Sequence, residues 1–149
     1  DPVTNGHIDV ILRLRKMFDS VSVLVTESAS KKYLFTLEER VQLVRASLGN
    51  KKGIQVFSSQ ELTVDFARRR QIRMIARSVR STGDWEYEYA IAEVNKKLAP
   101  EIETIFLLAD HKHSSTSSSI VRELAAFGAD TSEFVSDEVS KALKKKGKK

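Results

Sequence analysis

Residues 4–26 read TNGHIDVILRLRKMFDSVSVLVT, and this stretch decides the fold class. Ile8, Ile11 and Leu12 begin the apolar face of a helix. Residues 21–26 are rich in valine and almost entirely apolar, which is typical of a strand buried on both faces of a parallel sheet. A helix followed by such a strand predicts an α/β protein.

The same alternation continues along the chain. We predict helices over residues 8–18, 37–48, 63–70, 85–98, 118–127 and 137–143, and strands over residues 21–26, 54–57, 73–76 and 104–108. The pattern predicts a single-domain, Rossmann-like, doubly wound α/β fold with a parallel sheet and right-handed crossovers. Because a strand precedes the phosphate-binding helix in such folds, we also expect a strand of roughly ten residues before Asp1.

Composition narrows the class of protein. The 149 residues suit one domain, expected over residues 1–143, followed by a basic tail over residues 144–149. The net charge is +5, but six of the positive charges are lysines after residue 140, with no aromatic residue among them, so we expect no nucleic-acid partner. Cysteine is absent, and no apolar run approaches the roughly 20 residues of a membrane helix. We therefore expect a cytoplasmic protein with no membrane partner.

The turn Thr4-Asn5-Gly6-His7 has the composition of a helix N-terminus. Thr4 or Asn5 can cap the helix, Gly6 lets the backbone approach a ligand, and His7 adds a side-chain donor. The partial positive charge of a helix N-terminus suits a phosphate group. Taken alone, the tetrapeptide favours the simpler interpretation, a capped helix whose first-turn histidine is merely exposed.

Three further segments follow predicted strands, over residues 28–32, 77–83 and 109–119. They supply cations and hydroxyls, namely Lys31, Lys32, Arg77, Arg80, His111, His113, Ser117, Ser118 and Ser119. Ligands bind beyond the carboxyl ends of the strands in such sheets, so these segments should meet at one polyphosphate site. Read singly, the serines are a helix cap, the lysine pair is ordinary surface, and the arginines can pair with the nearby carboxylates of Asp84, Glu86 and Glu88.

Several common sites are not indicated by the sequence. It contains no Walker A motif and no G-x-G-x-x-G, so it indicates neither a P-loop kinase nor a nicotinamide enzyme. No Ser-His-Asp arrangement, no paired catalytic carboxylates and no metal-ligand spacing can be argued either. A Mg²⁺ ion would therefore be carried mainly by substrate phosphates.

The stretch from Asp1 to His7 resembles the T-x-G-H signature of the nucleotidylyltransferase superfamily, and the chain is similar to its bacterial phosphopantetheine adenylyltransferase family. Further matching stretches are residues 30–32 (SKK), 35–40 (FTLEER), 64–67 (VDFA), 77–80 (RSVR), 84–88 (DWEYE) and 117–121 (SSSIV). Together they cover nearly the whole chain, in order and at the spacing of the family. Thr4, where many relatives have histidine, also points to this family.

The resemblance implies transfer of AMP from ATP to 4′-phosphopantetheine, with Mg²⁺ carried by the ATP phosphates and dephospho-coenzyme A and pyrophosphate as products. It also implies a homohexamer, with dephospho-coenzyme A or coenzyme A as product or feedback ligand. By position, the catalytic residues would be His7, Lys31 and Arg80, and the phosphopantetheine-binding residues Lys31, Thr63 and Arg77. The residues that would bind ATP are His7, Ser78, Val79, Arg80, Glu88, His113, Ser114, Ser115, Thr116, Ser117, Ser118 and Ser119. It implies no protein ligand for a metal.

The sequence departs from the family pattern at three places. Ser78 stands where glycine is usual, and a positive φ there would strain a serine. The sequence lacks the Gly-Thr-Phe that usually precedes the Asp-Pro pair, whose threonine binds both substrates, and the aromatic residue usual near His113. Two alternatives stay open: another phosphate acceptor such as nicotinate mononucleotide, and a nucleotide-binding module without turnover.

Overall fold

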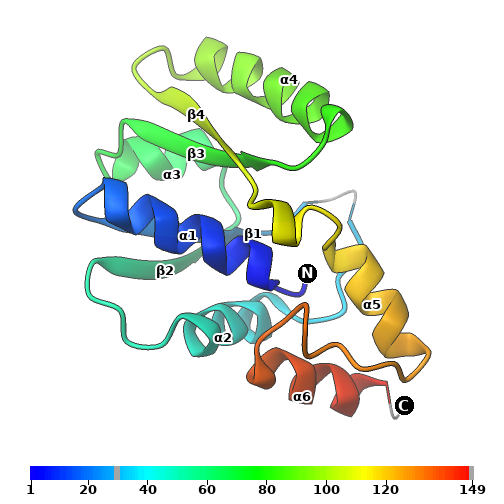
Figure 1. Cartoon of the computed structure of the whole chain (residues 1–149). Helices are drawn as coiled ribbons and strands as arrows, with labels where there is room; N and C mark the ends of the chain where they lie inside the picture. The colour runs from blue at the N-terminus through cyan, green and yellow to red at the C-terminus, as the bar shows by residue number, and fades with distance from the viewer. Residues whose placement is uncertain (29–30, 148–149) are drawn as a thin grey trace.

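A computed structural model describes residues 1–28 and 31–147 of the chain. Its helices are α1 (Asn5–Met17), α2 (Leu37–Leu48), α3 (Thr63–Arg69), α4 (Thr82–Leu98), α5 (Ser118–Ala126) and α6 (Asp137–Lys146), with a 3₁₀ turn η1 (His111–His113). Its strands are β1 (Val21–Thr26), β2 (Ile54–Ser59), β3 (Met74–Val79) and β4 (Glu103–Leu108). Figure 1 shows helices flanking the strands, which confirms the predicted α/β class. Ala29 and Ser30 of the predicted site segment, and Lys148 and Lys149 of the predicted tail, lie outside the described residues.

The strands pair two by two. β1 runs parallel to β2, with Val21 opposite Ile54, and β3 runs parallel to β4, with Met74 opposite Glu103. Helix α2 connects the strands of the first pair and α4 those of the second. Within residues 1–28 and 31–147 each strand has one strand neighbour, so the parallel strands form two sheets of two rather than one continuous sheet.

Helix α1 joins the two strand pairs. In Figure 1 it lies in front of the strands. Val10 and Leu14 of α1 are buried with Leu107 of β4, and Val21 of β1 packs against the same cluster. Full burial of each such side chain contributes about 1.5–3 kcal/mol to the stability of the fold. The shared apolar cluster therefore holds α1 against both strand pairs.

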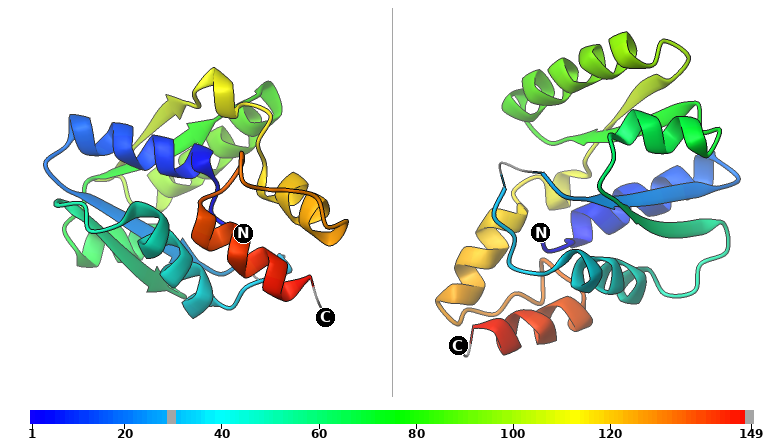
Figure 2. Two further views of the ribbon diagram at one scale, coloured as in Figure 1. Left: turned by 60° about the horizontal axis from the view of Figure 1, so that its bottom comes forward. Right: turned by 180° about the vertical axis from the view of Figure 1, so that it is seen from behind.

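Helices α5 and α6 form a second unit beside α2, visible in both views of Figure 2. Val121 of α5 and Val139 and Leu143 of α6 are buried together with Phe35, the residue just before the N-cap of α2. Val3, near the start of the chain, packs against the same cluster, so this packing brings the start of the chain close to α5.

Helix α2 begins with the predicted capping box. Thr36 Oγ1 accepts the Glu39 N–H at 3.2 Å, and Glu39 Oε2 accepts the Thr36 N–H at 2.8 Å. The helix ends at Gly49, whose φ of 62° lies in the left-handed region that favours glycine. Both ends therefore confirm the prediction made from sequence.

Several elements are longer than the sequence indicates. Helix α1 begins at Asn5 rather than at residue 8, α4 begins at Thr82 rather than at residue 85, and β2 continues to Ser59 rather than ending at residue 57. Strand β3 continues to Val79, so Arg77, Ser78 and Val79 lie in the strand and not in the connection after it; β4 provides backbone partners as far as Leu108. The strain considered for Ser78 is absent, because Gln71 is the one non-glycine residue with positive φ in the described part of the chain. Helix α6 continues to Lys146, so Lys144 to Lys146 of the predicted tail are helical.

Candidate functional site

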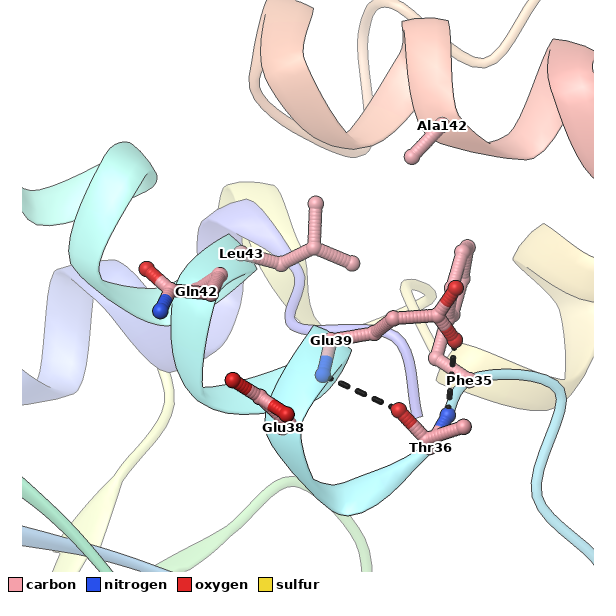
Figure 3. A pocket seen from close by; sticks show the side chains of 7 residues that line it. All are labelled: Phe35, Thr36, Glu38, Glu39, Gln42, Leu43 and Ala142. Carbon is pink, nitrogen blue, oxygen red and sulfur yellow. Dashed lines mark hydrogen bonds between the residues drawn. The ribbon is translucent and has the colours of Figure 1, made fainter.

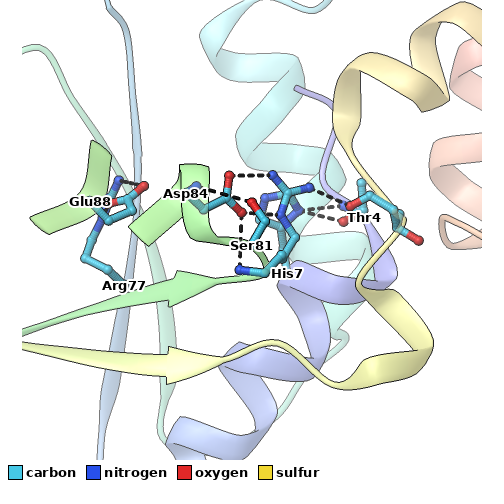
Figure 4. A network of polar contacts seen from close by, with 8 residues as sticks. Thr4, His7, Arg77, Ser81, Asp84 and Glu88 are labelled. Carbon is cyan, nitrogen blue, oxygen red and sulfur yellow. Dashed lines mark hydrogen bonds and ion pairs between the residues drawn. The ribbon is translucent and has the colours of Figure 1, made fainter. Parts of the chain in front are cut away.

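The first turn of α1 fixes the tautomer of His7. Thr4 is the N-cap of the helix, and its backbone N–H donates to His7 Nδ1 at 3.1 Å. Thr4 Oγ1 lies 2.8 Å from the same nitrogen, as Figure 4 shows. Because Nδ1 accepts the backbone N–H, it carries no proton, and the neutral ring carries its proton on Nε2. His7 is therefore a side-chain hydrogen-bond donor through Nε2.

The surroundings of His7 favour this neutral form. Burial by the protein, together with the positive charge of Arg80, lowers the pKa of His7 to about 4. By its solvent-accessible surface, however, His7 is an exposed residue, so desolvation of the ring is incomplete. The bond from Thr4 is the firmer reason for the neutral form, because protonation of Nδ1 would break it. At neutral pH the Nε2–H of His7 can therefore donate a hydrogen bond while the ring carries no charge.

Arg80 connects three segments at this site. Its Nε and Nη2 donate to the Asp84 carboxylate at 2.8 and 3.2 Å, and its Nη1 donates to the Thr116 carbonyl oxygen at 2.8 Å. The hydrogen bond from Arg80 lowers the pKa of Asp84 and keeps it ionised. Figure 4 shows Asp84 at the start of α4 beside His7 and Thr4. Arg80 thus holds the end of β3, the first turn of α4 and the loop before α5 next to the first turn of α1.

The loop before α5 lies against the first turn of α1. A Cβ added to Gly6 would stand only 3.3 Å from the Cβ of His113, so glycine permits this close approach. Ser118 Oγ donates to the Pro2 carbonyl oxygen at 2.8 Å. Ser117 caps α5 through its hydroxyl, as predicted by the simpler interpretation, in which the serines are a helix cap. The start of α5 is therefore both a capped helix end and a neighbour of His7.

The segment that carries Lys31 also reaches the start of the chain. The Leu34 N–H donates to Asp1 Oδ2 at 2.6 Å, and Arg122 Nη1 of α5 donates to the Asp1 carbonyl oxygen. The positive charges of Arg122, Arg40 and Lys31 all act at the backbone nitrogen of Asp1. Lys31 is therefore close enough to act electrostatically on the residues that lead into α1.

Arg77 and Glu88 form a two-pronged ion pair across β3 and α4. Arg77 Nε lies 2.5 Å from Glu88 Oε2, and Nη2 lies 2.9 Å from Oε1. The resemblance assigns the two residues to different substrates, whereas the structure joins them directly, as Figure 4 shows. Glu88 thus neutralises the guanidinium that is expected to bind a phosphate.

The other predicted residues lie at the same ends of the strands but outside this network. Thr63 begins α3 after β2, and Ser78 and Val79 end β3, with the Val79 side chain in the protein interior. The exposed members are Lys31, Ser114, Ser115 and Ser119. In the part of the chain that the structure describes, no hydrogen bond or ion pair joins Lys31 or Thr63 to His7. The structure therefore bonds Arg80 to Thr116 and brings the charge of Arg80 close to His7. His113 lies against Gly6, Ser118 against Pro2, and Lys31 acts electrostatically at Asp1.

Sequence reasoning missed two residues that organise the site. Asp84 was expected only as a possible ion-pair partner, although its spacing of four residues from Arg80 indicates pairing at the start of a helix. Arg40 was not singled out. Its partner Thr26 lies 14 positions away, so no local pattern could have indicated their contact.

The cavity drawn in Figure 3 lies elsewhere in the molecule. It has a volume of about 380 Å³, lies between α2 and α6, and is lined by Phe35, Thr36, Glu38, Glu39, Gln42, Leu43 and Ala142. None of these residues belongs to the predicted site. The cavity therefore provides no support for the predicted chemistry.

Residues 1–28 and 31–147 contain neither a cluster of metal-ligating side chains nor a helix suited to span a membrane. Among these residues no three His, Asp or Glu side chains are grouped so that they could hold a metal ion. None of the helices found there is both long enough and apolar enough to cross a membrane.

Comparison with known proteins supplies the family. Residues 1–124 match the family described as Cytidylyltransferase-like. The chain is 44% identical to the phosphopantetheine adenylyltransferase of Dictyoglomus thermophilum over 98% of this chain and 89% of the relative. It is 45% identical to the protein of that name from Hahella chejuensis over 96% and 89% of the two chains, and 42% identical to that from Finegoldia magna over 98% and 90%.

The chain belongs to the phosphopantetheine adenylyltransferase family. It is therefore a nucleotidyltransferase, and the predicted fold and family are both confirmed. The roles of individual residues follow as proposals.

Proposed function

We propose that this chain transfers AMP from ATP to 4′-phosphopantetheine, a step of coenzyme A biosynthesis. An oxygen of the phosphopantetheine phosphate attacks the α-phosphorus of ATP and forms a new P–O bond. The bond from the α-phosphorus to the oxygen that bridges to the β-phosphate breaks, and pyrophosphate leaves with that electron pair. Such an in-line displacement requires alignment and charge stabilisation, and no covalent enzyme intermediate. The names and identities of the relatives support this reaction.

The fixed tautomer of His7 is the observation that carries the proposal at this site. Negative charge increases on the equatorial oxygens of the α-phosphate in the transition state. The neutral Nε2–H of His7, preorganised by Thr4, can donate to one of these oxygens without a proton transfer. The partial positive charge at the N-terminus of α1 acts in the same direction.

The remaining roles follow the positions of the family motif. We assign the phosphate and arm of phosphopantetheine to Lys31, Thr63 and Arg77. We assign ATP to His7, Ser78, Val79, Arg80, Glu88 and the loop residues His113, Ser114, Ser115, Thr116, Ser117, Ser118 and Ser119. Arg80 adds positive charge near His7 and also orders the loop through its bond to Thr116. Arg77 must exchange or share its Glu88 partner when a phosphate binds.

Mg²⁺ fits this assignment as a companion of the substrate. The described residues offer isolated oxygen ligands rather than a cluster, and Mg²⁺ usually keeps waters and binds mainly to nucleotide phosphates. When bound, the ion neutralises charge on the departing pyrophosphate. The cationic side chains then hold the phosphates that Mg²⁺ leaves exposed.

We also propose a cytoplasmic homohexamer that binds dephospho-coenzyme A and coenzyme A as product or feedback ligands. Helix α4 has no buried residue, and Trp85, Tyr87 and Tyr89 on it are 43%, 59% and 50% exposed. Large exposed aromatic side chains on one helix favour a contact between subunits. Light scattering coupled to size-exclusion chromatography measures the mass of the assembly.

One assay tests the reaction and its acceptor. Protein, ATP and Mg²⁺ are mixed with phosphopantetheine, and pyrophosphate release is followed, with nicotinate mononucleotide as the second acceptor. We expect release with phosphopantetheine alone. Release only with nicotinate mononucleotide would replace the proposed acceptor, and tight ATP binding without release from either would identify a binding module.

A further inference from the structure

Arg40 is a buried arginine outside the residues assigned to either substrate. It lies in the first half of α2 and is only 7% exposed. Its Nη1 donates to the carbonyl oxygen of Thr26, the last residue of β1, at 2.7 Å, and its Nη2 donates to Glu27 Oε1 at 3.2 Å. The guanidinium carbon stands 3.9 Å from the centre of the Tyr33 ring. One side chain therefore joins the end of β1 to the segment that returns towards α2.

Tyr33 extends this constraint to the backbone of Lys31. The Tyr33 hydroxyl accepts the Ser28 N–H at 2.7 Å, and the Ser28 carbonyl oxygen accepts the Lys31 N–H at 3.1 Å. On the other side of Lys31, the Leu34 N–H is held by Asp1 at 2.6 Å. The backbone is thus fixed before and after Lys31, with the Arg40–Tyr33 contact between α2 and this segment.

Stability of the fold is a poor explanation for Arg40. Its Nε is buried and has no hydrogen-bond partner within the described part of the chain. A buried donor without a partner opposes folding, and well-packed apolar side chains often replace buried ion pairs without loss of stability. What an apolar side chain cannot do is bond a carbonyl and a carboxylate while it stacks on an aromatic ring. The arrangement therefore points to a requirement for a defined conformation of this segment.

We propose that Arg40 is a positioning residue that orients Lys31 towards the phosphate of the acceptor substrate. The inference rests on the proposed function, which assigns that phosphate to Lys31. Arg40 acts through Tyr33 and the backbone, and it does not touch the substrate. Its loss therefore raises KM for phosphopantetheine and leaves KM for ATP nearly unchanged, because the loop that is assigned to ATP is held separately by Arg80.

The test compares Arg40→Met with Arg45→Met. Arg45 is a matched control, because it lies on the same helix and donates to a strand carbonyl, that of Val56, at 2.9 Å. We expect Arg40→Met to raise KM for phosphopantetheine by about tenfold or more, and Arg45→Met to leave it within about twofold. Tyr33→Phe removes the hydroxyl that holds Ser28 but keeps the ring, so it provides a second variant should Arg40→Met fail to fold.

A second readout does not depend on activity. Trypsin cleaves after lysine, so the rate of cleavage after Lys31 and Lys32, followed by mass spectrometry, reports how firmly this segment is held. We expect faster cleavage in Arg40→Met and Tyr33→Phe than in the wild type or Arg45→Met. If the wild type releases no pyrophosphate, the proposed function fails, and the cleavage rates still decide whether Arg40 holds the segment. Unchanged cleavage and unchanged KM in both variants, or equal changes in Arg45→Met, would overturn the proposal.

Discussion

Replacing His7 by alanine removes a side-chain donor that Thr4 preorganises at the first turn of α1. Loss of such a donor raises the barrier by about 3–4 kcal/mol, which corresponds to a decrease of about 10²- to 10³-fold in kcat. The affinity for ATP should change little, because the assigned phosphate contacts are spread over Arg80 and the loop before α5. Steady-state pyrophosphate release measures kcat and both KM values.

Thr4→Val is a milder change that tests the same hydrogen-bond donor. Valine keeps the shape of the buried threonine and the backbone N–H that donates to His7, but removes the hydroxyl 2.8 Å from Nδ1. Loss of one hydrogen bond of this kind contributes about 1 kcal/mol, so kcat should fall by about fivefold. If His7→Ala keeps kcat within about tenfold of the wild type, His7 does not stabilise the transition state as argued.

The same reasoning predicts how His7 titrates. Its folded-state pKa lies near 4, below the ordinary value of 6.5, so the folded protein binds this proton more weakly than the unfolded chain does. Stability from this residue is therefore complete above pH 6.5 and decreases as the pH falls towards 4. An NMR titration of the imidazole C–H signals measures the pKa directly, and the spectrum of His7→Ala identifies His7 among the three histidines. A midpoint at 6.5 or above would show that His7 is not held in the neutral form.

Two smaller changes test the surroundings of the site and of α2. Gly6→Ala places a Cβ 3.3 Å from the Cβ of His113. We therefore expect a several-fold increase in KM for ATP with little loss of thermal stability. An unchanged KM would show that the closeness of His113 to α1 does not matter for ATP binding. Thr36→Ala removes the capping box and should lower the free energy of unfolding in urea by about 1 kcal/mol, whereas Thr36→Ser should change it by only a few tenths. Equal stability of Thr36→Ala and the wild type would contradict the stabilising role of the cap.

Much of the secondary structure could be predicted from residues that are close together in sequence. The bounds of β1 match the apolar run over residues 21–26, and the capping box places the start of α2 at Leu37. Both depend on side chains within a few positions of each other, which is why pattern and propensity suffice. The extent of β3 could not be predicted in this way. Arg77 to Val79 are extended because β4 pairs with them, and β4 lies more than twenty residues further along the chain.

The sequence by itself determined the family, the α/β class and the segments that gather at the carboxyl ends of the strands. These depend on residue types in order, and the rule for parallel sheets converts that order into a location. Only the tertiary structure decided which side chains pair there. The bond from Arg80 to Thr116 spans 36 positions and that from Arg40 to Thr26 spans 14, so each depends on how helices pack against strands. A hydrogen bond tolerates an error of only a fraction of an ångström in the distance between donor and acceptor. The packing of the whole chain sets that distance.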